Sequence, residues 1–254
     1  MVESDVHVDA VADALSKRAS LLSVLADAPS TQRELRDELG VSRSTVYKAL
    51  RELEALGIVT EVDAGYDLTG FGRLAWRRHT DWLARLDHLE AARRLLSEVP
   101  SDEWLPLSLF ERGHVVVPGR SDPERPLRRM ERFADETSTL RCLSPAGFPR
   151  YLDPIHQDVK AGQRVVTLVV EPPAARRLSE GYERFDDVIA ADGFDLHVTA
   201  DELPFGMMLF DTDCIGLFVY DDGALVGAAF SEAPEALAWG ETTYRAALER
   251  ATPV

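Results

Sequence analysis

The sequence predicts a chain of mixed class, α+β overall with an α/β second part, and three observations carry this prediction. Residues 31–59 read as two short helices around a tight turn, followed by a strand. Residues 71–99 keep apolar side chains at the alternating three- and four-residue spacing of a long amphipathic helix. Beyond Pro100, strand-like and helix-like segments alternate, which is the pattern of helices packed on a sheet.

We therefore expect three parts. Residues 1–70 hold the short helices and a hairpin, residues 71–99 form a linker helix, and residues 104–254 form an α/β domain with a mixed sheet. A chain of 254 residues with 45% hydrophobic residues is long enough for two cores. One opening helix is expected over residues 5–27, ended by Pro29, and it would pack behind the short helices.

The first short helix has clear start and stop signals. Ser30 or Thr31 is the expected N-cap, with Glu34 three residues after Thr31, where a capping box would place it, and Gly40 permits the tight turn that follows. Ser42 would cap the second helix, which ends at Gly57. Apolar side chains recur in this second helix at i, i+4 and i+7, so one face should be buried. That face holds Val46, Leu50 and Leu53, flanked by Ala49 and Leu56.

The opposite face of the second helix is polar and basic. The segment from Val41 to Arg51 contains no carboxylate, although the chain carries 44 acidic residues and a net charge of -16. DNA phosphates explain this pattern, because they repel carboxylates, whereas Arg and Lys release counterions. The predicted DNA-contacting residues are Ser42, Arg43, Ser44, Thr45, Tyr47, Lys48 and Arg51 on the second helix, with Thr31 and Arg33 on the first.

Residues 58–62 and 66–69 are expected to pair as a hairpin, which completes a winged helix-turn-helix. The segment VSRSTVYKALRELEALGIV resembles the recognition segment of the MarR, ArsR and TrmB-like families of prokaryotic transcription regulators. The resemblance implies double-stranded DNA as the partner. The wing departs from families that carry Arg or Lys there, which argues against insertion into the minor groove. Its carboxylates are Glu61, Asp63 and Asp67.

A stripe of seven positions on the linker helix follows a heptad pattern and indicates a homodimer. Palindromic operators are read by dimers that place two recognition helices about one DNA turn apart, so a dimer helix beside the wing fits DNA reading. Packing of the stripe within its own domain is the alternative. The stripe positions are Ala75, His79, Trp82, Leu86, Leu89, Arg93 and Leu96.

The second part is predicted to alternate strands and helices. Strands are expected over residues 114–118, 139–143, 164–170, 195–199, 206–210, 214–220 and 224–230. Helices are expected over residues 123–135, 148–162, 172–190 and 234–250. The run VVTLVV suits a central strand covered on both faces, and Asp221-Asp222-Gly223 predicts a tight hairpin.

Three segments of this second part carry a further resemblance: TADELPFGMMLFD, CIGLFVYDDGALVGAAF and AWGETTYRAALERA. They resemble the effector domain attached to many archaeal winged-helix regulators, the middle-domain family named after a methanogenesis regulator. The resemblance implies a regulator whose C-terminal domain senses an effector. It also implies a fold related to the phospholipase D-like domain of TrmB-type regulators.

Motifs for catalysis are absent from the second part. A phospholipase D-type site needs a histidine followed two residues later by lysine, and none of His114, His156 and His197 is followed in this way. The sequence also lacks a Gly-rich phosphate loop, a G-x-S-x-G elbow and a histidine pair at metal-ligand spacing. We therefore expect no catalytic residues, no metal and no cofactor, and a chain that is not an enzyme. A metabolite enzyme anchored to DNA is the alternative.

An effector pocket is expected at the strand ends of the sheet. Basic side chains would receive an anionic metabolite there, and aromatic side chains would form an apolar floor. The predicted ligand-binding residues are Arg141, Arg150, Tyr151, His156 and Phe205. Both cysteines, Cys142 and Cys214, are expected to be buried and structural, because nothing in the sequence activates either thiol.

Composition indicates the setting in which the protein works. Only Lys17, Lys48 and Lys160 are lysines among the 28 basic residues, and this Arg-rich, carboxylate-rich surface is typical of proteins from salt-loving archaea. Concentrated salt weakens counterion release, so shape and direct contacts should count for more in DNA binding. No apolar run is long enough to cross a membrane, and the acidic start is not a signal peptide. We expect a cytoplasmic protein without a membrane partner. The alternative to DNA reading is a winged-helix adaptor that contacts the transcription machinery.

Overall fold

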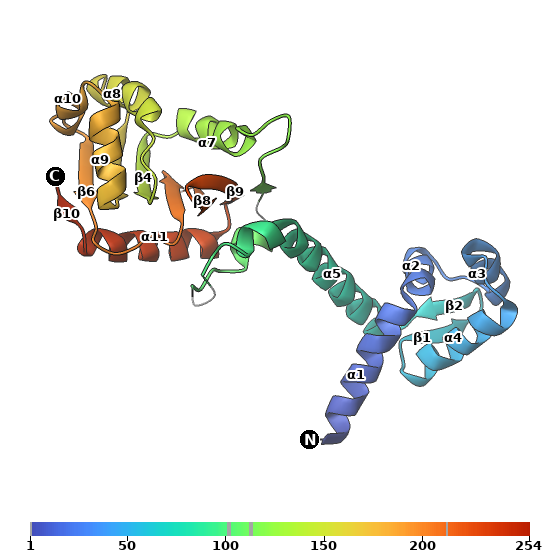
Figure 1. Ribbon diagram of the computed structural model, residues 1–254. Helices are drawn as coiled ribbons and strands as arrows, with labels where there is room; N and C mark the ends of the chain where they lie inside the picture. The colour runs from blue at the N-terminus through green and yellow to red at the C-terminus, as the bar shows by residue number, and fades with distance from the viewer. Residues whose placement is uncertain (1, 101–102, 112–113, 212) are drawn as a thin grey trace. The chain divides into compact units, whose positions relative to one another are not determined.

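The chain folds into two compact units, Met1–Leu86 and Asp87–Val254 (Figure 1). The computed structural model describes residues 2–100, 103–111, 114–211 and 213–254. The predicted mixed class is confirmed, because helices closed by a small hairpin make up the first unit and an eight-stranded mixed sheet lies in the second. Within these described ranges, no helix combines the length and the apolar character that a membrane crossing requires.

The first unit contains four helices before its hairpin. They are α1 (Val2–Lys17), α2 (Ala19–Asp27), α3 (Gln32–Leu39) and α4 (Arg43–Ala55), followed by β1 (Val59–Val62) and β2 (Gly65–Leu68). The prediction of one opening helix over residues 5–27 is wrong, because the helix is interrupted at Arg18. The Arg18 guanidinium turns to α4, where its Nη2 lies 2.5 Å from Glu52 Oε2. This ion pair fastens the opening helices to α4.

The capping box at the start of α3 is confirmed, and its N-cap is Thr31 and not Ser30. Thr31 Oγ1 accepts a hydrogen bond from the Glu34 backbone N–H (3.3 Å), and Glu34 Oε2 accepts one from the Thr31 N–H (2.8 Å). These backbone and side-chain hydrogen bonds to Thr31 lower the pKa of the Glu34 carboxyl. Gly40 then ends α3 at φ 64°, in the left-handed region that the sequence requires of it.

Thr31→Ala is expected to lower the free energy of unfolding by about 1 kcal/mol, because the exchange leaves an N-terminal N–H of α3 without its cap. Urea denaturation followed by circular dichroism measures this change. Thr242→Ala is the matched control, since Thr242 is exposed inside a helix and, among the described residues, its hydroxyl bonds only to the Ala238 carbonyl one turn earlier. An equal loss in both variants would mean that the Thr31 cap adds nothing of its own.

The predicted buried face of α4 is confirmed. Val46, Ala49, Leu50 and Leu53 are all at most 3% exposed, whereas Leu56, predicted to flank them, is only partly buried. The rest of this core comes from α1, α2, α3 and the hairpin with the residue before it, and its members include Leu15, Leu22, Leu35, Ile58 and Leu68. The core fixes which side of α4 faces outward.

Helix α5 (Gly70–Leu96) spans the boundary between the units, and the elements of the second unit follow it. They are α6 (Ser108–Glu111), β3 (His114–Val116), α7 (Arg125–Asp135), β4 (Thr139–Ser144), the 3-10 turn η1 (Pro149–Tyr151), α8 (Leu152–Lys160), β5 (Val165–Val170), α9 (Pro172–Gly181), α10 (Phe185–Ile189), β6 (Phe194–Val198), β7 (Gly206–Phe210), β8 (Cys214–Asp221), β9 (Ala224–Ser231), α11 (Pro234–Glu249) and β10 (Thr252–Pro253).

Two helices of the second unit differ from the prediction. The expected helix over residues 172–190 is two helices, because Tyr182 has an extended backbone and its hydroxyl lies 3.0 Å from His156 Nδ1. The expected helix over residues 148–162 begins as the turn η1 before it becomes α8. Both departures place an aromatic side chain against its neighbours instead of continuing the helix.

The sheet of the second unit has the strand order β10-β6-β5-β4-β7-β8-β9-β3. Strands β4, β5 and β6 run parallel, and all other pairs are antiparallel. Helices α7, α8, α9 and α10 supply the core on one face, which we call the α8 face. Helices α6 and α11 and the end of α5 supply the core on the other, the α11 face.

Candidate nucleic-acid interface and ligand pocket

The α4 residues predicted to contact DNA all lie on the exposed side of the helix. Ser42 caps α4 by accepting a hydrogen bond from the Thr45 N–H (3.1 Å), and its own hydroxyl lies within 2.9 Å of the Ser44 and Thr45 hydroxyls. Tyr47 is 53% exposed despite its apolar ring. The structure thus brings together Ser42, Arg43, Ser44, Thr45, Tyr47, Lys48 and Arg51 on one surface.

The cations of this surface are largely unneutralised. Within the described residues, neither Arg43 nor Lys48 forms an ion pair. Arg51 Nη1 lies 3.4 Å from Glu54 Oε2, a long and exposed contact that water weakens. A surface with free cations and no acid among them suits a polyanion.

The two residues predicted at α3 differ in how firmly their side chains are held. Arg33 is 85% exposed in its side chain and reaches Asp37 only at 3.8 Å. Thr31 is held by the capping box, so its hydroxyl is already occupied. Any DNA contact made by Thr31 would therefore compete with the cap.

The wing is tied to the start of α3 by a backbone bridge. The Ser30 N–H donates to the Tyr66 carbonyl (3.0 Å), and the Tyr66 N–H donates to the Ser30 carbonyl (2.9 Å). Gly65 allows this approach, since it has φ 121° and a Cβ there would lie 2.5 Å from the Ser30 oxygen. The hairpin position is thereby fixed relative to α3.

The acidic character of the wing is partly neutralised. The Asp67 carboxylate accepts hydrogen bonds from Arg73 Nη2 of α5 at 2.6 and 2.7 Å. Glu61 and Asp63 remain exposed near its tip. The carboxylates that point outward are consistent with a wing that stays out of the minor groove.

The heptad stripe of α5 divides into three groups. His79 is 9% exposed and stacks on Trp76, with ring centroids 5.7 Å apart. Trp82 and Leu86 are 54% and 41% exposed. Ala75 packs against the core of the first unit, and Leu89 and Leu96 pack against the core of the second. Arg93 is exposed and forms an ion pair with Glu90.

The five residues predicted to bind a ligand do not lie together. Arg141 Nη1 donates to Glu241 Oε2 of α11 (2.7 Å), and its Nη2 donates to the Asp211 carbonyl (2.9 Å). Phe205 packs against Trp239 on the same α11 face. The five predicted residues therefore line no common cavity in the described structure, because alternation along β4 turns Arg141 away from the α8 face.

The other three predicted residues lie on the α8 face. His156 is 1% exposed, and its Nδ1 is paired with the Tyr182 hydroxyl. Arg150 Nη1 donates to Glu124 Oε1 (3.1 Å), and its guanidinium lies over the Tyr151 ring. Of the five, only Tyr151 lines the cavity described next.

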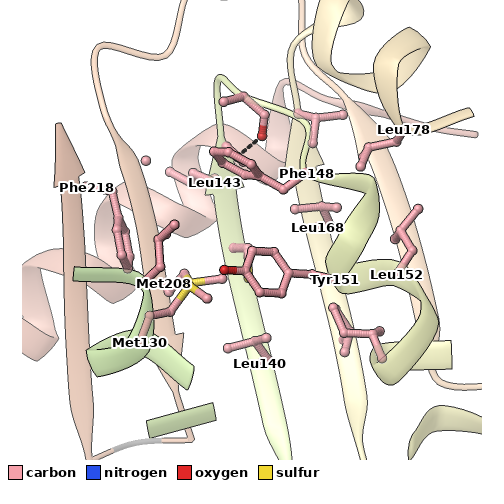
Figure 2. Close-up of a pocket in the computed structure, with 18 of the residues that line it drawn as sticks. Met130, Leu140, Leu143, Phe148, Tyr151, Leu152, Leu168, Leu178, Met208 and Phe218 are labelled. Atoms are coloured by element: carbon pink, nitrogen blue, oxygen red, sulfur yellow. Dashed lines mark hydrogen bonds between the residues drawn. The ribbon is translucent and has the colours of Figure 1, made fainter. Parts of the chain in front are cut away.

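A cavity of about 80 Å³ lies between the sheet and the helices of the α8 face (Figure 2). Its walls are almost wholly apolar, and no charged side chain lines it among the residues described. Figure 2 shows Tyr151 lying across it, with Met130 and Met208 on one side and Leu152 on the other. Sequence reasoning missed Met130, Cys142, Met208 and Tyr220, although the alternation in β4 already placed Leu140, Cys142 and Ser144 on one face.

Neither cysteine is placed for chemistry. Cys142 and Cys214 are both buried, as predicted, and burial raises the pKa of each thiol to about 12. Both therefore stay protonated near neutral pH. In the described part of the chain, no three His, Cys, Asp or Glu side chains are close enough to share a metal ion.

Comparison with known proteins connects this architecture to one family. The family model "Methanogenesis regulatory protein FilR1, middle domain" matches residues 123–250, half of the chain, and "HVO_A0261 N-terminal domain" matches residues 8–94. The methanogenesis regulatory protein FilR1 of Methanothrix harundinacea (strain 6Ac) is 23% identical over 219 residues, which are 82% of this chain and 49% of that protein. The chain thus spans about half the length of this curated relative.

Two solved structures also overlap with the chain. TrmBL2, described as an archaeal chromatin protein with a novel mode of DNA binding, has a TM-score of 0.45 at 15% identity, over 96% of this chain and 99% of its own. NucT from Helicobacter pylori has a TM-score of 0.46 at 8% identity, over 56% of this chain and 99% of its own. The match to the middle-domain model gives the assignment: the chain belongs to the FilR1 middle-domain family.

Proposed function

We propose that the chain is a sequence-specific DNA-binding transcription regulator of an archaeal cell, with a C-terminal domain that senses a small molecule. The observation that carries the proposal is the exposed face of α4 in the winged helix-turn-helix. Within the described residues it presents Arg43 and Lys48 without an ion pair, and it has no carboxylate from Val41 to Arg51. The names of the family and of the FilR1 relative support regulation as its role.

In this proposal α4 enters the major groove of double-stranded DNA. Arg43, Tyr47 and Lys48 would share the base edges and the nearest phosphates, since Arg and Lys pair with guanine O6 and N7. Arg33 of α3 would contact the flanking backbone. No catalytic residue, metal or cofactor is needed for such a role, in keeping with a chain that is not an enzyme.

We further propose that the regulator is a homodimer held by the exposed apolar side chains of α5, which present Trp82 and Leu86. A two-fold dimer would set two α4 helices on a palindrome. It would work in the cytoplasm, and its Arg-rich, strongly acidic composition favours a salt-rich one.

Genome-wide occupancy of the tagged protein in its own cells tests this function. A second strain carries Arg43→Ala, Lys48→Ala and Arg51→Ala together. Discrete peaks over a shared palindrome are expected for the parent chain, and their disappearance is expected in the variant. The genes beside the peaks would indicate the regulated pathway.

Two other outcomes would count against DNA reading. Peaks that are unchanged in the variant would favour an adaptor that reaches promoters through the transcription machinery. An absence of peaks, together with turnover of a metabolite by the purified chain without DNA, would favour an enzyme anchored to DNA.

A further inference from the structure

We propose that the cavity on the α8 face is a ligand site that takes an uncharged apolar molecule, at most about one ring in size, with a single hydrogen-bonding group. This inference rests on the proposed sensing function for its biological meaning, since it names the chemical class of the effector. The sequence predicted an anionic ligand, whereas the uncharged lining of this cavity favours a neutral one.

The cavity exists because small residues occupy one end of the sheet. On the α8 face, Cys142 of β4 pairs in register with Leu168 of β5 and with Met208 of β7, and all three line the cavity. Ser144, the next β4 residue on the same face after Cys142, pairs with Val170 of β5. Gly206, the first residue of β7, has no side chain. Larger residues at these positions would fill the space that is left beneath α7 and α8.

The lining selects against charge. An ionised group moved from water into such walls loses its hydration, and no cation or anion is present to replace it. The polar groups available are the hydroxyls of Ser144, Tyr151 and Tyr220 and the thiol of Cys142. Ser144 already donates to the Ala146 carbonyl (2.5 Å).

Tyr220 supplies the hydrogen bond in this proposal. Its hydroxyl has no hydrogen-bond partner in the part of the chain that the structure describes, although its ring is largely buried beside Phe148. Burial raises the pKa of Tyr220, so the hydroxyl stays neutral and can both donate and accept. A ligand hydroxyl or carbonyl would replace water as its hydrogen-bond partner.

Tyr151 controls the way in. Together with Leu127, it lines both the cavity and an outer groove between α7 and η1. Its hydroxyl donates to Glu131 Oε1 of α7 (3.3 Å) and accepts from Arg150 Nη2 (3.1 Å). These contacts are exposed and therefore weak, so the ring can turn aside to admit a ligand.

Size sets the upper limit. A volume of about 80 Å³ far exceeds the ~10–15 Å³ that one water needs, and it is smaller than an engineered apolar cavity of about 150 Å³ that takes benzene. One ring fits when Tyr151 gives way, whereas a nucleotide does not.

The test uses the full chain labelled with ¹³C at the methionine methyl groups. Met130 and Met208 line the cavity, whereas Met207 is fully buried in the core of the α11 face and is an internal control. Titration with p-cresol, a neutral ring with one hydroxyl, is expected to shift the Met130 and Met208 signals and to leave Met207 in place. Benzoate, of similar size but charged, is expected to shift none of them.

Two variants locate the binding. Cys142→Leu fills the cavity and is expected to abolish the p-cresol shifts, while Cys142→Ala, which enlarges it, is expected to keep them even if the leucine variant fails to fold. Tyr220→Phe is expected to weaken p-cresol by about fivefold, the value of one neutral hydrogen bond, and to leave toluene binding unchanged.

The proposal is overturned if p-cresol shifts neither methyl group, if benzoate binds equally well, or if a folded Cys142→Leu chain keeps the shifts. Equal p-cresol affinity in Tyr220→Phe would overturn the role of that hydroxyl. The measurement contains no DNA, so its failure is distinct from a failure of the proposed regulator function, which depends on α4.

Discussion

Replacing Arg43 and Lys48 together by alanine is expected to weaken binding to the operator about thirtyfold or more. Both side chains are exposed on α4, and neither is paired with a carboxylate in the described ranges. Each is expected to contribute about 1 to 3 kcal/mol through a base or a phosphate contact, and about 1.4 kcal/mol is a factor of ten. Neither contributes to the core, so the variant should fold as the parent does.

Fluorescence anisotropy on operator and on unrelated DNA, at several salt concentrations, separates the two kinds of contact. A phosphate contact is lost on both DNAs, and the slope of log affinity against log salt should fall by about 0.9 for each. A base contact is lost on the operator alone and relaxes its sequence preference.

The matched control is Arg176→Ala with Arg177→Ala, which removes the same charge from α9. Both arginines are exposed and, within the described chain, free of ion pairs. If this control weakens operator binding as much as the α4 variant does, net charge explains the effect and α4 is not the reading helix.

The first unit follows the sequence closely because its signals are local. The cap at Thr31, the left-handed Gly40 and the spacing of Val46, Leu50 and Leu53 each act within one or two helical turns. Such signals need no knowledge of distant partners. Once the buried side of α4 is predicted from this spacing, the residues on its exposed side are predicted as well.

Breaks in predicted helices depend on partners far along the chain. Arg18 leaves the helix for Glu52, 34 residues later, and the Tyr182 hydroxyl meets His156, 26 residues earlier. Periodicity carries no information about such contacts. For this reason the sequence predicts one continuous helix in place of α1 and α2, and one in place of α9 and α10.

The separation of the predicted ligand-binding residues has a different cause. Arg141 and Tyr151 both lie near strand ends in the sequence, but nearness to a strand end does not determine which face of the sheet a side chain occupies. In β4 the side chains alternate, so Arg141 lies toward Glu241 and α11 while Cys142 lines the cavity. The register of three strands then decides which small residues meet, and that register is set only by the folded sheet.

Replacing Trp82 and Leu86 together by aspartate is expected to convert the proposed dimer into monomers. The two side chains lie one helical turn apart on α5 and are 54% and 41% exposed, with Leu83 at 43% beside them. A tryptophan at the centre of an interface commonly contributes about 2 kcal/mol or more, and two buried carboxylates would add repulsion across the two-fold axis. The association constant should fall at least about a thousandfold.

Sedimentation velocity over a range of protein concentrations measures this change. Trp104→Asp with Leu107→Asp is the control, because these residues are the same two types, are 69% and 47% exposed, and lie outside α5. The control should stay dimeric and should bind the operator as the parent does. Dissociation of the control alone would move the dimer contact to the segment before α6.

Operator binding by the Trp82 and Leu86 variant connects the dimer to function. A monomer places one α4 helix on one half-site, so it should lose the contribution of the second half-site while keeping its affinity for a single half-site. The Arg43 and Lys48 variant of α4, in contrast, should lose affinity for the single half-site as well as for the full palindrome. If the α5 variant is monomeric and still binds the full palindrome as tightly as the parent, the two half-sites are not read by one dimer, and the palindrome would then be occupied by two independent chains.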